Sequence, residues 1–182
     1  MQRLPTMNKE EIIQQLHAAK ELFTGFCSEI DTDSFFRQPA TKWSIAQNVK
    51  HLVVSANTTR LAYAFPKFVL QWYAGRPNRA SRSYDELVAK YKTKLQQGGK
   101  ASGRFVPAVI SLKEGKEKML HNFSMAMDRL ISAIENHWND QQLDQYIAPH
   151  PLLGKITLRE LGYFTIYHTH HHLAIVKERL RD

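Results

Sequence analysis

Residues 157–180, TLRELGYFTIYHTHHHLAIVKERL, form the stretch of the chain that decides how its fold is interpreted. Thr157 followed by Glu160 is a capping-box pattern, which predicts a helix that starts here and ends near Leu180. The residues expected to face inward follow one another at alternating steps of three and four, as they do on one side of an α-helix. They are Leu158, Leu161, Thr165, His168, His172 and Ile175. The pattern therefore places two histidines on the inward face of a long helix.

Three other segments show the same helical periodicity of apolar residues. They are residues 9–30, 44–66 and 111–138. Capping-box pairs open the second and the third of these segments at Ser44 and Ser111. The second should end near Pro66, because proline has no backbone N–H to donate to a continuing helix. No alternation of useful length indicates a β-strand. Four long amphipathic helices predict an all-α fold, a four-helix bundle.

The connections predict how the four helices are ordered. The first two helices are joined by a short loop, residues 31–42, and the last two by a short polar link, so each pair should be antiparallel. Residues 66–110 are long enough to run the length of the bundle, so the second and third helices could be parallel, in up-down-down-up order. Glycine and proline interrupt this irregular insertion, in which Ser83 can start a short helix that ends near Gln97.

Length and composition indicate one ordinary globular domain. The insertion is too short and polar to bury a core of its own, so we expect a single domain over residues 1–182, with residues 1–6 as a loose tail. No apolar run is long enough to span a membrane, and we expect no membrane partner. Cys27 is the only cysteine, which excludes an internal disulfide and fits a reducing cytoplasm.

The formal net charge of +8 raises nucleic acid or an anionic ligand as a partner. The excess of positive charge is concentrated in residues 74–118. We interpret this stretch as a solvated basic face, because the chain has no zinc knuckle, no RRM-type aromatic motif and no basic-leucine-zipper pattern. Nucleic acid is therefore not an expected partner.

The histidine run suggests a metal site. His168 and His172 lie one helical turn apart on the inward face, where two imidazoles need polar partners that a metal ion would supply to both. Two alternatives stay open at this point: a hydrogen-bonded pair of core histidines, and a metal pair formed by His168 with His171. A third ligand must come from another segment, and His51 in the middle of the second helix is a candidate. The weaker candidates are His17, His121, His137 and His150.

Three segments of the chain resemble the DinB/YfiT-like proteins. Residues 42–52 (KWSIAQNVKHL) are similar to the family's tryptophan–serine signature that ends in His-Leu. Residues 150–157 (HPLLGKIT) resemble the segment before the family's last helix, and residues 167–173 (YHTHHHL) resemble its closing motif of two histidines four positions apart. The order and separation of the three motifs make the resemblance more specific than any one of them.

The resemblance implies an up-down-down-up bundle that holds a divalent metal ion on three histidines. Carried over position by position, the ligands are His51, His168 and His172, which selects His172 over His171. Imidazole ligands suit several transition metals, and zinc or nickel is the expected ion. The resemblance further implies a bacterial, cytoplasmic protein that forms a homodimer.

Three ligands leave a coordination position open, as in catalytic rather than structural zinc sites. The resemblance implies a transferase that activates a low-molecular-weight thiol for attack on an electrophilic substrate, with basic residues of 74–118 binding carboxylates of the thiol. A metal-dependent hydrolase is the second hypothesis, although the HTHHH run contains no glutamate to act as a base, and Glu160 is better explained as a cap. The third hypothesis is a non-catalytic, stress-related module for metal binding or protein interaction.

Overall fold

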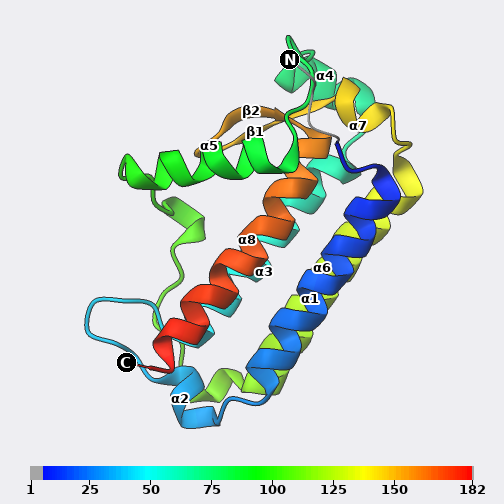
Figure 1. Ribbon diagram of the computed structural model, residues 1–182. Coiled ribbons are helices and arrows are strands. Elements are labelled where there is room, and N and C mark those ends of the chain that lie inside the picture. The colour runs from blue at the N-terminus through cyan, green and yellow to red at the C-terminus, as the bar shows by residue number, and fades with distance from the viewer. Residues whose placement is uncertain (1–5, 182) are drawn as a thin grey trace.

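The computed structural model describes residues 6–181, and four long helices dominate it (Figure 1). They are α1 (Lys9–Ser28), α3 (Ile45–Ala64), α6 (Lys116–His137) and α8 (Leu158–Arg179). In Figure 1, α1 and α8 run from the top of the view to the bottom, whereas α3 and α6 run from the bottom to the top. The predicted four-helix bundle is confirmed. Most of the expected loose tail, residues 1–6, lies outside the described residues.

Side-chain caps fix where three of these helices begin. Ser44 accepts a hydrogen bond from the backbone of Gln47, and the side chain of Gln47 accepts one from the backbone of Ser44, so the predicted capping box opens α3. Similar boxes open α1 and α8. The predicted start of the third long helix at Ser111 is wrong, because Ser111 caps only a short 3₁₀ turn. Gly115, with φ of 75°, then interrupts the chain before α6 begins.

The core lies between the four long helices, and two close contacts show how tightly they pack. The rings of Phe23 in α1 and Phe123 in α6 have centroids 4.9 Å apart. On α8, a Cβ atom at Gly162 would lie 2.9 Å from Cγ2 of Ile12, so glycine permits the close approach of α1 and α8. The largest fully buried side chains include Tyr63, Tyr163, Phe23, Phe35, Phe123, Ile12, Leu16, Met127 and Leu130.

Several short helices in the links were not predicted. Residues 31–42 were expected to be a loop but include α2 (Thr32–Phe36), which Asp31 caps by accepting a hydrogen bond from the backbone of Ser34. The insertion contains α4 (Lys67–Ala74) directly after Pro66, which suits the start of a helix because its missing N–H is not needed there.

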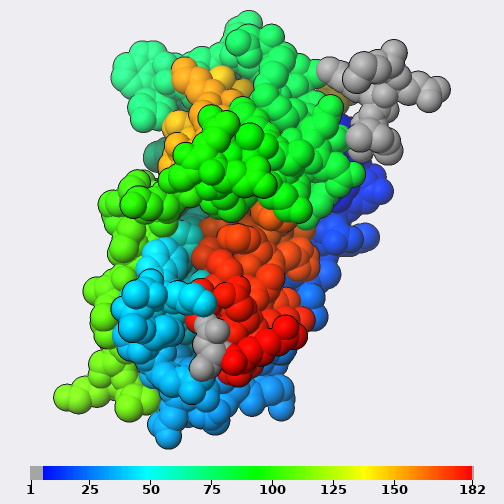
Figure 2. Space-filling view, turned by 60° about the vertical axis from the view of Figure 1, so that its left-hand side comes forward, coloured from blue at the N-terminus to red at the C-terminus, as the bar shows by residue number. Residues whose placement is uncertain are grey.

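The predicted short helix in the insertion is confirmed as α5 (Tyr84–Gln96), capped by Ser83. It packs on α8, and the space-filling view shows its green surface lying against the orange-red surface of α8 (Figure 2). A 3₁₀ turn, η1 (Gly103–Phe105), follows it and contacts α3. The insertion therefore brings two of its segments against the helices that carry the histidines.

A small β-hairpin lies at one end of the bundle, next to α7 (Gln142–Gln145) (Figure 1). Strands β1 (Ile147–His150) and β2 (Gly154–Thr157) pair antiparallel, with Ile147 opposite Thr157 and His150 opposite Gly154. The expectation of no strand is thus wrong for eight residues. Each strand has only four residues and β1 contains Pro149, so the alternation that marks a strand in sequence cannot develop.

The first turn of α8 carries two fully buried charged residues, and both are neutralised. Glu160 accepts hydrogen bonds from Nη1 and Nη2 of Arg79, at 2.7 and 2.8 Å, and one from the backbone N–H of Arg82 at 2.8 Å. Arg159 donates to Asp140 and Asp144 at 3.0 and 2.8 Å. Arg79 and Arg82 belong to the basic stretch that was expected to be solvated, and they instead tie the insertion to α8.

No helix within residues 6–181 combines the length and the hydropathy required to cross a membrane.

Candidate metal centre

Three histidine side chains from two helices meet in the interior of the bundle. His51 comes from α3, and His168 and His172 come from successive turns of α8. Nε2 of His168 lies 3.1 Å from Nε2 of His51 and 3.1 Å from Nε2 of His172. All three residues are buried, with exposed fractions of 5–6%. The inward position of His168 and His172 is the one that helical periodicity predicted.

The outer nitrogens of two of these rings are held by hydrogen-bond acceptors. Nδ1 of His51 lies 2.7 Å from the backbone carbonyl of Phe105, which can only accept, so this nitrogen carries the proton. Nδ1 of His172 lies 2.7 Å from Oδ1 of Asn48. The amide nitrogen of Asn48 donates to the carbonyl of Ser44 at 2.8 Å, which fixes the amide orientation and leaves Oδ1 as the acceptor. Nε2 of both histidines is therefore an unprotonated acceptor.

These proton positions leave a deficit of donors at the centre of the cluster. Two lone pairs, from His51 and His172, point toward Nε2 of His168, and that nitrogen can carry at most one proton. The donor set therefore fits a cation, which would accept all three lone pairs together. Zinc–nitrogen bonds are about 2.0–2.1 Å, which for tetrahedral zinc sets the nitrogens about 3.3 Å apart. The two distances of 3.1 Å from Nε2 of His168 are close to that value, and the three ligand atoms all lie within 4.8 Å of one another.

Burial keeps the three imidazoles neutral. It lowers the pKa of His168 well below its ordinary value, and the neighbouring His172 and His51 lower it further. Burial acts in the same direction on the pKa of His172. For His51, burial again lowers the pKa, while the hydrogen bond to the carbonyl of Phe105 partly opposes the shift. Neutral imidazole is the form that binds metal ions, so the cluster is ready for a cation at neutral pH.

Aromatic rings on both sides hold the three histidines in place. The ring of Trp43 is stacked on that of His172 at a centroid distance of 6.4 Å and is tilted against that of His51 at 5.1 Å. Phe164 is stacked on His168 at 4.8 Å. Because these neighbours restrict ring rotation, the Nε2 atoms are preorganised toward one another.

The cluster forms part of the wall of a pocket of about 820 Å³. Most of its lining is apolar or aromatic, and it includes no Asp or Glu among the described residues. Lys100 and Arg104, from the segment between α5 and α6, contribute the positive charge. A site of this size, with a few polar groups in an apolar wall, suits a small organic ligand.

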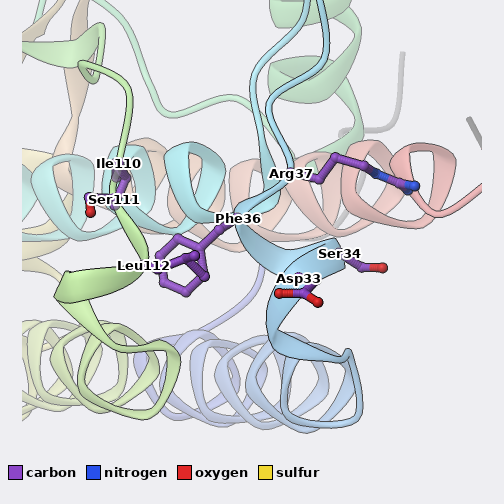
Figure 3. A pocket seen from close by; sticks show the side chains of 7 residues that line it. All are labelled: Asp33, Ser34, Phe36, Arg37, Ile110, Ser111 and Leu112. Atoms are coloured by element: carbon purple, nitrogen blue, oxygen red, sulfur yellow. The ribbon is translucent and has the colours of Figure 1, made fainter.

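A second pocket, of about 560 Å³, lies near α2 at the other end of the bundle (Figure 3). Phe36 and Leu112 lie toward one another there, while Arg37 points away from them. Its seven lining residues include no histidine and only one acid, Asp33. Of these two pockets, only the histidine pocket has a cluster of imidazoles in its lining.

The other sequence candidates lie away from the cluster centre. His171 and His150 line the same pocket, but neither offers a ring nitrogen to the cluster. His17, His121 and His137 are exposed on α1 and α6. Glu160 is the predicted cap of α8 and is also fully engaged by the insertion, so it is not a free base.

Two residues that hold the site were not predicted. Asn48 is fully buried, three positions after Ile45 and four before Leu52, so it belongs to the inward stripe of α3. A polar residue on that stripe one turn before His51 was the signal that could have identified it. The carbonyl of Phe105 left no such signal, because any residue could supply it.

Comparisons with known proteins agree with this fold. A family model described as the DinB superfamily matches residues 15–176. The chain is also similar to a solved structure described as "YfiT from Bacillus subtilis is a probable metal-dependent hydrolase with an unusual four-helix bundle topology". The match has 20% sequence identity and a TM-score of 0.56, and it covers 100% of this chain and 92% of that one. At that identity the likeness shows a common fold. No curated protein matches the chain.

Proposed function

The chain belongs to the DinB superfamily, and we propose that it is a metal-dependent enzyme that transfers a low-molecular-weight thiol to an electrophilic substrate. The observation that carries the proposal is the convergence of three neutral, preorganised Nε2 atoms in the wall of a large, mostly apolar pocket. His51, His168 and His172 would hold a divalent cation, with zinc or nickel as the expected ion.

A divalent cation with an open position supplies the ability to lower the pKa of a coordinated thiol or water. The protein's own contribution is to fix the three imidazoles through Phe105, Asn48 and the flanking aromatic rings. The apolar wall would exclude water from the reacting groups. In the proposed reaction a sulfur–carbon bond forms, the bond from that carbon to the leaving group breaks, and the thiol proton passes to solvent.

Two features of the pocket favour thiol transfer over hydrolysis. Zinc proteases and deaminases assist the metal-bound water with a nearby glutamate as general base, and the pocket lining contains no carboxylate. A thiol that has already lost its proton needs no such base. Lys100 and Arg104 would also bind the carboxylates of an anionic thiol, which extends the expectation for the basic stretch to two particular residues.

Metal-dependent hydrolysis is the second candidate, since the solved structure of similar fold is described as a probable metal-dependent hydrolase. A non-catalytic metal module is the third. The homodimer, the cytoplasmic location and the bacterial source stay predictions. Sedimentation of the purified protein at several concentrations would measure the oligomeric state.

The first experiment determines whether the site binds metal. Protein purified without chelator would be analysed for metal by mass spectrometry, beside His168→Ala and the exposed control His121→Ala. We expect close to one equivalent in the wild type and in the control, and little in His168→Ala. A full equivalent in His168→Ala would refute the proposed ligand set.

The second experiment separates the candidate activities. Metal-loaded protein would be assayed with glutathione, bacillithiol, mycothiol and coenzyme A against a generic electrophile, and separately with activated esters and amides. Metal-dependent thioether formation supports the transferase, and turnover of esters or amides without thiol supports the hydrolase. Replacing Lys100 and Arg104 by alanine should raise KM for an anionic thiol but not for uncharged 2-mercaptoethanol. Bound metal without turnover in any assay would favour the non-catalytic module.

A further inference from the structure

His150 ends strand β1 and lies in the same pocket as the metal cluster, outside the group of three histidines. Its ring centroid is 4.1 Å from that of Phe164, and Phe164 is in turn stacked on His168 at 4.8 Å. One aromatic ring therefore separates His150 from the candidate metal centre. Tyr91 contacts the same group from α5, with its centroid 6.4 Å from that of His150.

The hairpin turn fixes which nitrogen of His150 carries the proton. Nδ1 lies 3.2 Å from the backbone nitrogen of Leu152 and 3.1 Å from that of Leu153. A backbone N–H can only donate, so Nδ1 must be the acceptor of both bonds. In the neutral ring the proton then sits on Nε2. The turn thus selects one tautomer of the side chain.

Nothing in the described part of the chain uses that Nε2–H group. Within residues 6–181 it has no hydrogen-bonding partner. Nε2 of His150 is not among the buried side-chain atoms of residues 6–181 that lack a hydrogen bond, so this nitrogen is not sealed inside the protein. Because His150 lines the pocket, this donor is available to a ligand that binds there. Burial also lowers the pKa of His150 to about 4, so the ring stays neutral near pH 7.

We propose that His150 is a fixed, neutral hydrogen-bond donor to the substrate in this pocket. The surrounding wall is apolar and aromatic, so the matching ligand is an apolar or aromatic compound that carries an uncharged acceptor such as a carbonyl oxygen. This inference deepens the proposed function, on which it rests, by naming the class of the electrophilic substrate. The carbonyl oxygen would accept from Nε2–H of His150, while the ring or chain of the ligand would contact the apolar wall.

The tautomer can be measured directly and does not depend on activity. Long-range ¹H–¹⁵N spectra of histidine-labelled protein would be recorded between pH 7.5 and 5.5, with His150→Asn used to assign the signal. We expect a neutral ring with a protonated Nε2 and an unprotonated Nδ1 at every pH in this range. A ring protonated at Nδ1, or one that gains a second proton within this range, would overturn the proposal.

Binding of two molecules of matched shape tests the donor. Acetophenone carries a carbonyl oxygen where α-methylstyrene carries a CH₂ group, so the ratio of their affinities isolates the hydrogen bond. We expect the wild type to prefer acetophenone by about three- to tenfold, the effect of a single neutral hydrogen bond. The preference should be the same in metal-free and zinc-loaded protein, because the donor belongs to His150. Equal affinities, or no binding of either molecule, would overturn the proposal.

His150→Asn is the informative variant. The Oδ1 atom of asparagine can take the place of Nδ1 and accept from Leu152 and Leu153, so the turn is kept while the Nε2 donor is removed. We expect the affinity ratio to fall to about one in this variant and to stay unchanged in the exposed control His121→Asn. Retention of the preference in His150→Asn contradicts the assignment. If the preference behaves as expected but no thiol transfer is found, the proposed function fails while the donor assignment stands.

Discussion

Helix α8 buries polar side chains in two places, and the two differ in the partners they are given. In its first turn, Arg159 and Glu160 meet side chains of opposite charge, and each makes several hydrogen bonds. Two to three turns later, His168 and His172 meet His51, and three groups of the same kind point at one another. One helix thus contains a polar cluster that is complete and one that lacks a central partner.

The difference separates a structural role from a functional one. Buried polar groups are normally paired, and the Arg159 and Glu160 networks follow that rule and hold the insertion and α7 against α8. The histidine cluster departs from it in a specific way, because the outer nitrogens of His51 and His172 are satisfied by Phe105 and Asn48 while the inner nitrogens share too few protons. A shortage of donors at the centre of an otherwise ordered cluster is the arrangement that the proposed metal site requires.

The largest loss of folding stability is expected from breaking the ion-pair network around Arg159 and Glu160. Glu160→Ala would leave Arg79 and Arg82 without their buried carboxylate, and breaking a buried ion pair costs about 3–5 kcal/mol. Urea unfolding of metal-free protein would measure the loss, with exposed Glu135→Ala as the control. Metal content per folded molecule should be unchanged. A loss of less than about 1 kcal/mol would mean that the network does not hold the insertion.

At the histidine cluster, the main loss of folding stability is expected only when metal is present. Metal at 100 times its Kd should stabilise the wild type by about 2.7 kcal/mol, and His168→Ala should lose that gain. In metal-free protein His168→Ala removes a nitrogen that two lone pairs face but leaves a cavity, so the loss of stability should be smaller than the loss of the metal-linked gain. Thermal unfolding with and without zinc measures both. Strong destabilisation without metal would indicate instead that the histidines are a structural core pair.

Asn48 should have a smaller effect on the same site. It orients His172 by accepting from Nδ1, and loss of such a partner typically lowers metal affinity by about 10- to 100-fold. Asn48→Ala should therefore still bind metal, but at higher concentrations, which competition with a coloured chelator would quantify. Asn139→Ala, at an exposed position after α6, is the control. An unchanged affinity in Asn48→Ala would show that packing alone orients His172.

The smallest expected effect is on how the free energy of unfolding depends on pH, and it differs between the histidine pocket and the ion-pair network. Burial holds the pKa values of the pocket histidines below their ordinary 6.5 in the folded protein, so below that pH the unfolded chain binds more protons and folding is weakened. His150, with a folded pKa of about 4, should alone cost about 1 kcal/mol by pH 5.5 in metal-free protein. Unfolding as a function of pH, compared with His150→Asn, measures this contribution.

The complete cluster should respond at lower pH. The hydrogen bonds from Arg79 hold the pKa of Glu160 below its ordinary 4.5, so its stabilisation is fully present above that value and is lost as pH falls through the folded pKa. The two clusters should therefore give two steps in the pH dependence, the first between about 6.5 and 4 and the second below about 4.5. A flat profile between pH 7 and 5 would contradict the burial of neutral histidines.

Much of the fold could be predicted because its information is local. The caps at Ser44 and Thr157 and the stripe of α8 depend on residues within a few positions of one another, and the predictions are confirmed except at Ile175, which is half-buried while its neighbour Val176 is buried. The helical spacing also placed His168 and His172 inward, as observed. Spacing alone could not choose between His171 and His172, since both lie within one turn of His168. The resemblance made that choice, and the structure brings His172, not His171, into the cluster.

What sequence reasoning missed depends on contacts between distant segments. The carbonyl of Phe105 reaches His51 only because the insertion returns along α3, and a backbone acceptor has no signature in the sequence. Arg79 was expected to be a solvated surface charge, because no residue near it in the chain indicates its ion pair with the buried Glu160. The hairpin that holds His150 is too short to produce an alternating pattern.

The separation of the three histidines along the chain has a consequence for biosynthesis. His51 and His168 are 117 positions apart, and the carbonyl that orients His51 lies 54 positions after it. A growing chain cannot complete the cluster until the ribosome has passed residue 172, by which time α1, α3 and α6 have already been made. In a nascent chain that lacks α8, His51 is therefore present without the other two histidines of the cluster. Capture of an ion by the proposed site would be confined to chains in which α8 has been made and packed against α3, so earlier intermediates would not bind the ion there.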